Sequence, residues 1–343
     1  MKAAIYQGDH RFEVKEVPTP EPGPGEIVIK THFCSICGTD VHGVLYDVAT
    51  VGSVLGHEYS GTVSAIGPGV TLWKIGDRVA GAAGGAPPKG SKSLFVENPR
   101  YNFRTMGWGT LPPAFSGYAE YILMDAWMAS RVPDGVSDLQ ASMVEPMAAA
   151  YQAVDRSHMS AGDTVGVLGA GPLGLFALQI AKAKGASKVI VSEPAPARAA
   201  AARELGADEV LDPTKEDVVE RMAELTDGKG PHVIIEAAGA QPTLQQALEA
   251  VRYAGRVVLL AIAWEQVPVL PADWCTRDLE LTTTFAFKPE WWPECYKLLQ
   301  SGAVRVEPML KGDSIIALDD IEPTFKRLFK PSDEIKMVVD FEK

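Results

Sequence analysis

Two cysteines stand three positions apart in the stretch CSICGTDVH, which covers residues 34–42. A threonine, an aspartate and a histidine follow the second cysteine closely. This set of side chains suits three kinds of site: a redox-active thiol pair, half of a zinc clip, or one wall of a metal-dependent active site. The stretch alone does not choose among them, so the choice depends on what the rest of the chain supplies.

Further side chains of the metal-binding kind occur downstream. His57 and Glu58 stand in the motif GHEYSG, and Glu145 stands in VEPMAAAYQA. Cysteine, histidine and glutamate together are a ligand set of catalytic zinc sites, which keep one coordination position open. A single buried cysteine is more often ordinary packing, so the prediction of a metal site rests on the joint presence of these residues.

A glycine-rich loop, GAGPLG at 169–174, fits the pattern GxGxxG. It follows an apolar run at 164–168 and opens a helix-length segment, which is the context that dinucleotide binding requires. The glycines permit a tight turn and close approach of the backbone to a pyrophosphate, and the helix N-terminus offers N–H donors. We therefore expect the cofactor-binding loop to consist of Gly169, Gly171, Pro172, Leu173 and Gly174.

Glu193 ends the next apolar run, about 20 residues beyond Gly174, where a carboxylate can bind the adenosine ribose hydroxyls. Because a carboxylate repels a 2′-phosphate, Glu193 favours NAD over NADP. Arg198 leaves the alternative open, since an arginine could meet a 2′-phosphate or lie along the adenine ring.

Apolar strand-length runs alternate with helix-length segments after residue 162. The predicted strands are 164–168, 188–193, 209–212, 232–238, 255–261 and 279–285, and the predicted helices are 172–185, 196–206 and 216–225. The first 150 residues instead hold short strand-like runs at 26–30, 61–65 and 118–123, separated by glycine and proline. This alternation predicts the α/β class, with a parallel sheet covered by helices on both faces behind a β-rich domain.

The predicted domain limits follow from this change of pattern. We expect residues 1–152 to form a β-rich domain, 153–287 a doubly wound Rossmann domain that binds NAD, and 288–343 to return to the first domain. No internal repeat interrupts this order.

Composition narrows the class of protein. A net charge of -12 over 343 residues argues against nucleic acid or an anionic membrane as the main partner. No apolar run reaches the length of a membrane span, and the first ten residues turn polar too soon for a signal peptide. Four cysteines are too few for a disulfide framework. We therefore expect a cytoplasmic protein.

Several motifs together resemble the zinc-dependent medium-chain alcohol dehydrogenases. They are CGTDVH at 37–42, GHEYSGTVSAIGPGV at 56–70, GDRV at 76–79, EP at 145–146 and VGVLGAGPLGL at 165–175. The resemblance extends over essentially the whole chain and implies a GroES-like catalytic domain in front of the Rossmann domain. A glutamate at 145, where many members have cysteine, resembles the sorbitol, threonine and butanediol dehydrogenase branch.

The resemblance implies the roles of the site residues. Cys37 and His57 would hold one zinc, and Glu58 and Glu145 would complete the metal site, although the sequence does not show which glutamate is the direct ligand. Thr39 matches the residue that bonds the substrate oxygen, and His42 matches the histidine that passes its proton outward. With Glu58 these two residues form the implied catalytic set. Asp40 matches a supporting residue that fixes the loop or a histidine.

The implied reaction is reversible hydride transfer between NAD(H) and a secondary alcohol or ketone, with zinc as the Lewis acid. One thiolate and one carboxylate neutralise Zn²⁺, so a second carboxylate predicts a net negative site that could accept a hydrogen bond from a second substrate hydroxyl. This favours a diol or polyol. Four aromatic residues leave a cyclic alcohol open: Trp73, Trp108, Phe115 and Phe287.

The sequence departs from the family pattern in one region. Many members carry four cysteines near 85–105 that bind a structural zinc, and this chain has none there. We therefore expect one zinc per chain. By analogy with the family, we also expect a homotetramer, with a dimer as the alternative.

Two other functions stay open. A zinc-free enone or quinone reductase shares the fold but lacks the cysteine, histidine and glutamate set. A non-catalytic NAD-binding protein would not need Thr39 and His42. A thioredoxin-like use of Cys34 and Cys37 is disfavoured, because the surrounding βαβ pattern is missing.

Overall fold

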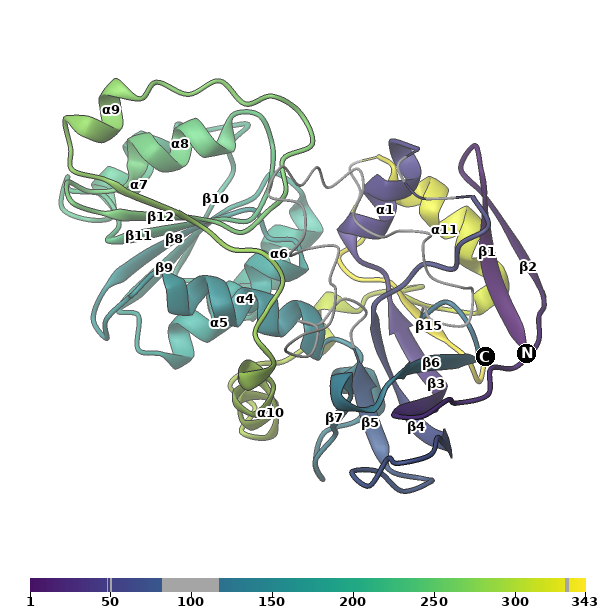
Figure 1. The fold of residues 1–343 in the computed structure, drawn as a ribbon. Helices are drawn as coiled ribbons and strands as arrows, with labels where there is room; N and C mark the ends of the chain where they lie inside the picture. Colours follow the sequence, from purple (N-terminus) through teal and green to yellow (C-terminus); the bar gives the residue numbers. More distant parts are fainter. Residues whose placement is uncertain (48, 50, 82–116, 331–332) are drawn as a thin grey trace. The chain divides into compact units, whose positions relative to one another are not determined.

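A computed structural model describes residues 1–47, 49, 51–81, 117–330 and 333–343 (Figure 1). The chain divides into two compact units. The first unit comprises Met1–Glu145, Gly312–Ser332 and Lys336–Lys343, and the second comprises Pro146–Lys311 and Asp333–Ile335. The domain limits proposed at residues 152 and 287 remain predictions.

The first unit is built on a seven-stranded sheet in which β3 is central. The path through this sheet is β14-β15-β3-β4-β5-β7, and β6 also pairs with β3. The strands are β3 (Glu26–Ser35), β4 (Glu58–Ile66), β5 (Arg78–Gly81), β6 (Tyr121–Asp125), β7 (Ser130–Arg131), β14 (Ile315–Ile316) and β15 (Val338–Asp340). A separate antiparallel pair consists of β1 (Lys2–Gly8) and β2 (Arg11–Glu16).

Short helices flank this sheet. They are α1 (Gly38–Leu45), α3 (Asp138–Ala141) and α11 (Ile321–Leu328), with 3-10 turns η3 (Ala126–Met128) and η6 (Leu318–Asp320). The core between the sheet and these helices is apolar and includes the fully buried rings of Tyr6, Tyr59, Tyr118 and Phe325. Packing of these large side chains fixes the strand ends that carry the candidate site.

The second unit holds a six-stranded parallel sheet with the order β10-β9-β8-β11-β12-β13. Its strands are β8 (Thr164–Leu168), β9 (Lys188–Ser192), β10 (Glu209–Leu211), β11 (Val233–Glu236), β12 (Arg256–Leu259) and β13 (Glu280–Thr283). The chain winds outward from β8 in one direction and from β11 in the other. The strand order therefore reverses between these two neighbours, which is where doubly wound sheets bind ligands.

Helices cover both faces of the parallel sheet, with α5 and α6 on one side and α7 and α8 on the other (Figure 1). The helical segments are α4 (Val144–Arg156), α5 (Pro172–Ala183), α6 (Pro196–Glu204), α7 (Val218–Glu224), α8 (Thr243–Ala250), α9 (Ala272–Cys275), α10 (Trp292–Gln300), η4 (Pro289–Trp291) and η5 (Glu307–Met309). The inner strands β8 and β11 are almost wholly buried, as expected for a sheet covered on both sides.

The predicted fold class is confirmed. Each of the six predicted strands after residue 162 contains a strand of the parallel sheet, and the three predicted helices appear as α5, α6 and α7. The predicted strand at 118–123 begins later than expected, at Tyr121. Within the described ranges, no helix has both the length and the apolar character needed to span a bilayer.

Candidate metal and cofactor site

Cys37 lies where β3 gives way to α1. It is the N-cap of this helix, and its Sγ accepts a hydrogen bond from the backbone N–H of Thr39 at 3.4 Å. The helix then carries Thr39 and His42 just beyond the thiol. His42 is half-buried, and burial lowers the pKa of its imidazole below the ordinary 6.5, so the ring is neutral at pH 7.

His57 and Glu58 are placed by the start of β4. Gly56 before them has φ +91°, and a Cβ there would lie 2.8 Å from the Tyr118 ring, so only glycine fits this turn. Glu58 is the first residue of β4 and pairs in register with Ser35 at the end of β3. The two strand ends thereby bring the Ser35 hydroxyl to the Glu58 carboxylate, to which it donates a hydrogen bond.

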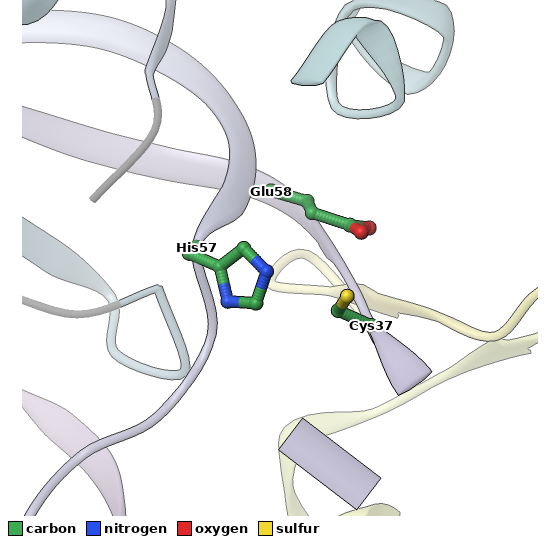
Figure 2. Close-up of side chains that lie close together, drawn as sticks. All are labelled: Cys37, His57 and Glu58. Carbon is green, nitrogen blue, oxygen red and sulfur yellow. The ribbon is translucent and has the colours of Figure 1, made fainter. Parts of the chain in front are cut away.

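Cys37, His57 and Glu58 converge, with one ligand atom from each lying within 4.8 Å of the others (Figure 2). Zinc binds sulfur, nitrogen and oxygen at about 2.0–2.3 Å, so the donors of one ion lie roughly 3–4 Å apart. A thiolate, an imidazole and a carboxylate at this spacing fit a zinc ion with small adjustments. The structure thus brings together three of the four residues predicted as metal ligands.

Asp40 lies next to His57 and orients its imidazole. Its Oδ1 lies 3.4 Å from Nδ1 of His57, and its Oδ2 accepts a hydrogen bond of 2.9 Å from the Tyr118 hydroxyl. Burial raises the pKa of Asp40, but the neighbouring imidazole outweighs this, and the net pKa is lowered. A charged Asp40 beside Nδ1 leaves Nε2 of His57 to act as the metal-binding atom.

Lys336 is a residue of this site that sequence reasoning missed. Its side chain is only 2% exposed, its ammonium pairs with Glu58, and it donates a hydrogen bond of 3.0 Å to the carbonyl of Ile36. Burial lowers the pKa of Lys336, but the carboxylate of Glu58 and the thiolate of Cys37 more than offset this, so the net pKa is raised. A charged residue inside the apolar run IKMVVDF was the feature that could have revealed it.

Lys336 corrects the predicted charge of the site. Counting Cys37, Glu58 and Glu145 as anions and Zn²⁺ as a cation gave a net negative site. The buried ammonium adds one positive charge and restores neutrality. The charge count therefore no longer favours a second substrate hydroxyl by itself.

Glu145 lies in the first turn of α4 and is half-buried. Burial raises the pKa of its carboxyl to about 7, while the cation of His57 lowers it and the charge of Glu58 raises it further. The three-residue group with metal-ligand spacing does not include Glu145. Glu145 therefore interacts electrostatically with His57 and Glu58 but is not one of the three converging side chains.

The glycine-rich loop follows β8 at the edge where the strand order reverses. Gly169 has φ +97°, and Gly171 is the N-cap of α5, with Pro172 in its first turn ahead of Leu173. A Cβ on Gly174 would lie 1.9 Å from the carbonyl oxygen of Gly169, so the close packing of loop and helix requires glycine there. A Cβ on Gly171 would meet no atom within 4 Å, which leaves that side of the loop open.

Glu193 lies directly after β9 and is buried against this loop. Its Oε2 accepts a hydrogen bond of 2.7 Å from the N–H of Ala170, and its Oε1 accepts one of 2.9 Å from the N–H of Ala195. The carboxylate is thus fixed beside the loop expected to hold the pyrophosphate. Arg198, in the first turn of α6, donates from Nε and Nη2 to the carbonyl of Glu334 at 3.3 and 3.0 Å.

Comparison with known proteins finds two family models in the chain. Residues 23–134 match the alcohol dehydrogenase GroES-like domain, and residues 172–301 match the zinc-binding dehydrogenase domain. Human sorbitol dehydrogenase is 35% identical over 89% of this chain and 87% of its own length. The chain belongs to the zinc-dependent medium-chain alcohol dehydrogenase family. The predicted family is confirmed, and the chain is an oxidoreductase whose cofactors are zinc and a nicotinamide dinucleotide.

Further relatives cover nearly the full chain. (R,R)-Butanediol dehydrogenase of Bacillus subtilis is 32% identical over 99% of both chains. The crystal structure of 2R,3R-butanediol dehydrogenase from the same species has a TM-score of 0.86, with 29% identity and 99% coverage of each chain. A dehydrogenase structure from Sinorhizobium meliloti, solved with NADP, has a TM-score of 0.84 at 29% identity, covering 99% of this chain and 98% of its own.

The remaining predicted residues fall in two groups. Trp73 is buried and donates from Nε1 to the carbonyl of Ala126 at 2.7 Å, and Phe287 packs edge-on against Trp292, so both have structural contacts. Trp108, Phe115 and the cysteine-free stretch at 85–105 lie outside the described residues. Cys34 is buried in the core of the first unit, and all four cysteines are free thiols.

Proposed function

We propose that this chain catalyses NAD-dependent oxidation of a secondary alcohol, and the reverse reduction, on a diol or polyol. The convergence of Cys37, His57 and Glu58 carries the proposal, because a zinc-free reductase has no need of such a group. Relatives named as sorbitol and butanediol dehydrogenases support a substrate with more than one hydroxyl. A cyclic alcohol is the second candidate.

The metal would be held by Cys37 and His57, with Glu58 and Glu145 as the remaining acids. Zinc in this position supplies a Lewis acid that polarises the alcohol or ketone oxygen. Ser35 and Lys336 both bond Oε2 of Glu58, so a contact between its Oε1 and the metal would leave those partners in place. We propose that Glu145 and Oε1 of Glu58 are the two carboxylate groups available to the metal, and that Lys336 and Ser35 hold Glu58 in position for it.

The residues of α1 would handle the proton. Thr39 follows the metal-binding Cys37 by two residues, and its hydroxyl would accept the proton of the substrate hydroxyl. His42, kept neutral by burial, would take that proton onward to solvent. The hydride leaves from the carbinol carbon to the nicotinamide, so the alcohol loses one hydride and one proton in all.

The cofactor would bind at the glycine-rich loop, with its adenosine ribose on Glu193. Both oxygens of this carboxylate are fixed by backbone N–H groups, and a fixed anion repels a 2′-phosphate. Arg198 is already bonded to the carbonyl of Glu334, which supports NAD over NADP. Because a related dehydrogenase binds NADP, turnover with NAD and with NADP should be measured side by side.

We further propose a cytoplasmic homotetramer, with a dimer as the alternative. Four free thiols support a reducing compartment. Among the described strands, β13 ends the parallel sheet and has a neighbour on one side only, so a second copy could pair with it.

Absorbance of NADH across a panel of secondary alcohols tests the proposed function. The panel comprises linear diols, polyols and cyclic alcohols, each with NAD or NADP, before and after chelation. We expect chelator-sensitive turnover with NAD on a diol or polyol, and the Cys37→Ser variant should lose zinc and turnover while it still binds NAD. Turnover that survives chelation in the wild-type protein would point to the zinc-free reductase instead.

A further inference from the structure

The 333–336 segment has contacts in both units within four consecutive residues. Asp333–Ile335 is part of the second unit, whereas Lys336 begins the last part of the first. A chain spans at most about 3.5 Å per residue, so the Cα atoms of residues 334 and 336 lie within about 7 Å of each other. The segment therefore has little slack between its two attachments.

The first attachment is at the metal site. Lys336 is buried, and its ammonium is paired with Glu58 and bonded to the carbonyl of Ile36. The backbone is fixed next to it, since the N–H of Ile36 donates to the carbonyl of Met337 at 2.8 Å. A buried ammonium that leaves its carboxylate loses far more than a surface pair does. The position of Lys336 is therefore tied to that of Glu58.

The second attachment is at the start of α6. The planar guanidinium of Arg198 donates twice to the carbonyl of Glu334, and the N–H of Ala197 donates to Oδ1 of Asp333 at 3.3 Å. The same short run begins with Ala195, whose N–H is bonded to Glu193. The backbone that carries the proposed ribose-binding carboxylate thus also holds the 333–336 segment.

We propose that Arg198 is a positioning residue that couples dinucleotide binding to metal binding through the 333–336 segment. The proposal rests on the proposed function, because it requires both ligands. A ribose bound at Glu193 orders the start of α6, and with it the guanidinium that fixes the carbonyl of Glu334. This limits the movement of Lys336, which holds Glu58 in place. Such coupling is reciprocal, so bound metal tightens dinucleotide binding by the same factor.

The test times the release of zinc from the zinc-loaded protein to a chromophoric chelator, with and without saturating ADP-ribose. ADP-ribose has the adenosine ribose and the pyrophosphate but lacks nicotinamide, so a ring that covers the metal cannot produce the effect. We expect ADP-ribose to slow zinc release about 5–10-fold in the wild-type protein, within the usual range of coupling between sites. In Arg198→Met the ratio should fall close to one.

Two further variants make the test specific. Arg198→Lys keeps a charge and one donor, so it should retain part of the ratio. Arg203→Met removes another arginine of α6, whose Nη2 lies 3.5 Å from the carbonyl of Val210, and should retain the full ratio. ADP-ribose is titrated separately on every variant, so that weaker binding is not mistaken for lost coupling.

A wild-type ratio of one, or an unchanged ratio in Arg198→Met, would overturn the proposal. Should Arg198→Met fail to fold, an unchanged ratio in Arg198→Lys together with equal ADP-ribose affinity for zinc-loaded and zinc-free wild-type protein would overturn it. Protein that holds no zinc, or that does not bind ADP-ribose, would overturn the proposed function as well. Zinc content and the titration report these two failures separately.

Discussion

His42 shows how a single side chain is adjusted by its surroundings. Burial lowers the pKa of its imidazole below the ordinary value of 6.5. The ring therefore stays neutral, and able to accept a proton, down to a lower pH than an exposed histidine. We expect His42→Ala to slow alcohol oxidation at pH 7 by about 10²-fold, at the low end for general base catalysis because water can partly replace the ring. The gap should narrow towards pH 10, where hydroxide accepts the proton.

Initial rates of NADH formation between pH 5.5 and 10 check this expectation. The wild-type rate should fall as the pH drops through the lowered pKa of His42, and the variant should lack that inflection. His158→Asn, which replaces an exposed histidine of the second unit at φ +49°, is the matched control. Parallel profiles for the wild-type protein and His42→Ala would remove His42 from the proton path.

Lys336 shows how one buried ion pair can affect the stability of the whole protein. Lys336→Met leaves the Glu58 carboxylate buried without its cation, and breaking a buried pair costs about 3–5 kcal/mol. We expect Tm to fall by roughly 10 °C for a chain of this size. Lys336→Arg keeps the charge and should recover much of the loss. Equal melting temperatures by calorimetry for the wild-type protein and Lys336→Met would show that the pair contributes little.

At the scale of elements, the turn between β8 and α5 contains one glycine required for packing, Gly174, and one expected to leave room for the cofactor, Gly171. Gly174→Ala puts a Cβ 1.9 Å from a backbone oxygen and should destabilise the fold by about 3 kcal/mol. Gly171→Ala meets nothing and has an ordinary φ of -70°, so its Tm should not change. It should instead weaken NAD binding about tenfold, because its Cβ stands where the pyrophosphate approaches.

Melting curves and NAD titrations on both variants check this contrast. The variants serve as controls for each other, since they lie in the same loop three residues apart. If Gly171→Ala bound NAD as the wild-type protein does, the pyrophosphate would have to lie elsewhere.

The strands of the second unit were predictable because each is a short run rich in apolar residues, and α5, α6 and α7 followed from the helix-length segments between them. Helix α8, between β11 and β12, was not predicted. The first unit was harder to predict. Strands such as β2, with the sequence RFEVKE, have no long apolar run, and β3 extends well beyond its predicted end at residue 30. Its extension to Ser35 depends on pairing with β4 and β15, which are distant in the sequence. Such pairings leave no local pattern.

At the scale of the whole molecule, the same limit explains what was missed at the site. The motifs pointed to Cys37, His57 and Glu58, which lie within 22 positions of one another. Lys336 reaches Glu58 across 278 positions of the sequence. A lysine inside an apolar run signals that its charge is buried, but it does not name the partner, so only the folded chain could show that Lys336 pairs with Glu58.

Assembly is also a property of the whole molecule. Leu281 on β13 is 36% exposed at the free edge of the parallel sheet. A lysine on a strand edge opposes pairing with another strand, so Leu281→Lys should shift the protein to a smaller species in sedimentation velocity. Leu270→Lys, which changes another exposed leucine of the second unit, should leave the distribution unchanged. An unaltered distribution for Leu281→Lys would place the contact between copies elsewhere.

The order of the strands in the first unit has a consequence for synthesis on the ribosome. β15 lies between β14 and β3, and all of Pro146–Lys311 is translated before β14 and β15 emerge. The parallel sheet of the second unit can therefore form on the nascent chain, while the end of β3 at residues 33–35, beyond its pairing with β6, still lacks its partner strand. Until Lys336 arrives, Glu58 has no buried cation. The first unit begins first and finishes last, so the strand end next to Cys37 and Glu58 is completed only when the last residues of the chain emerge.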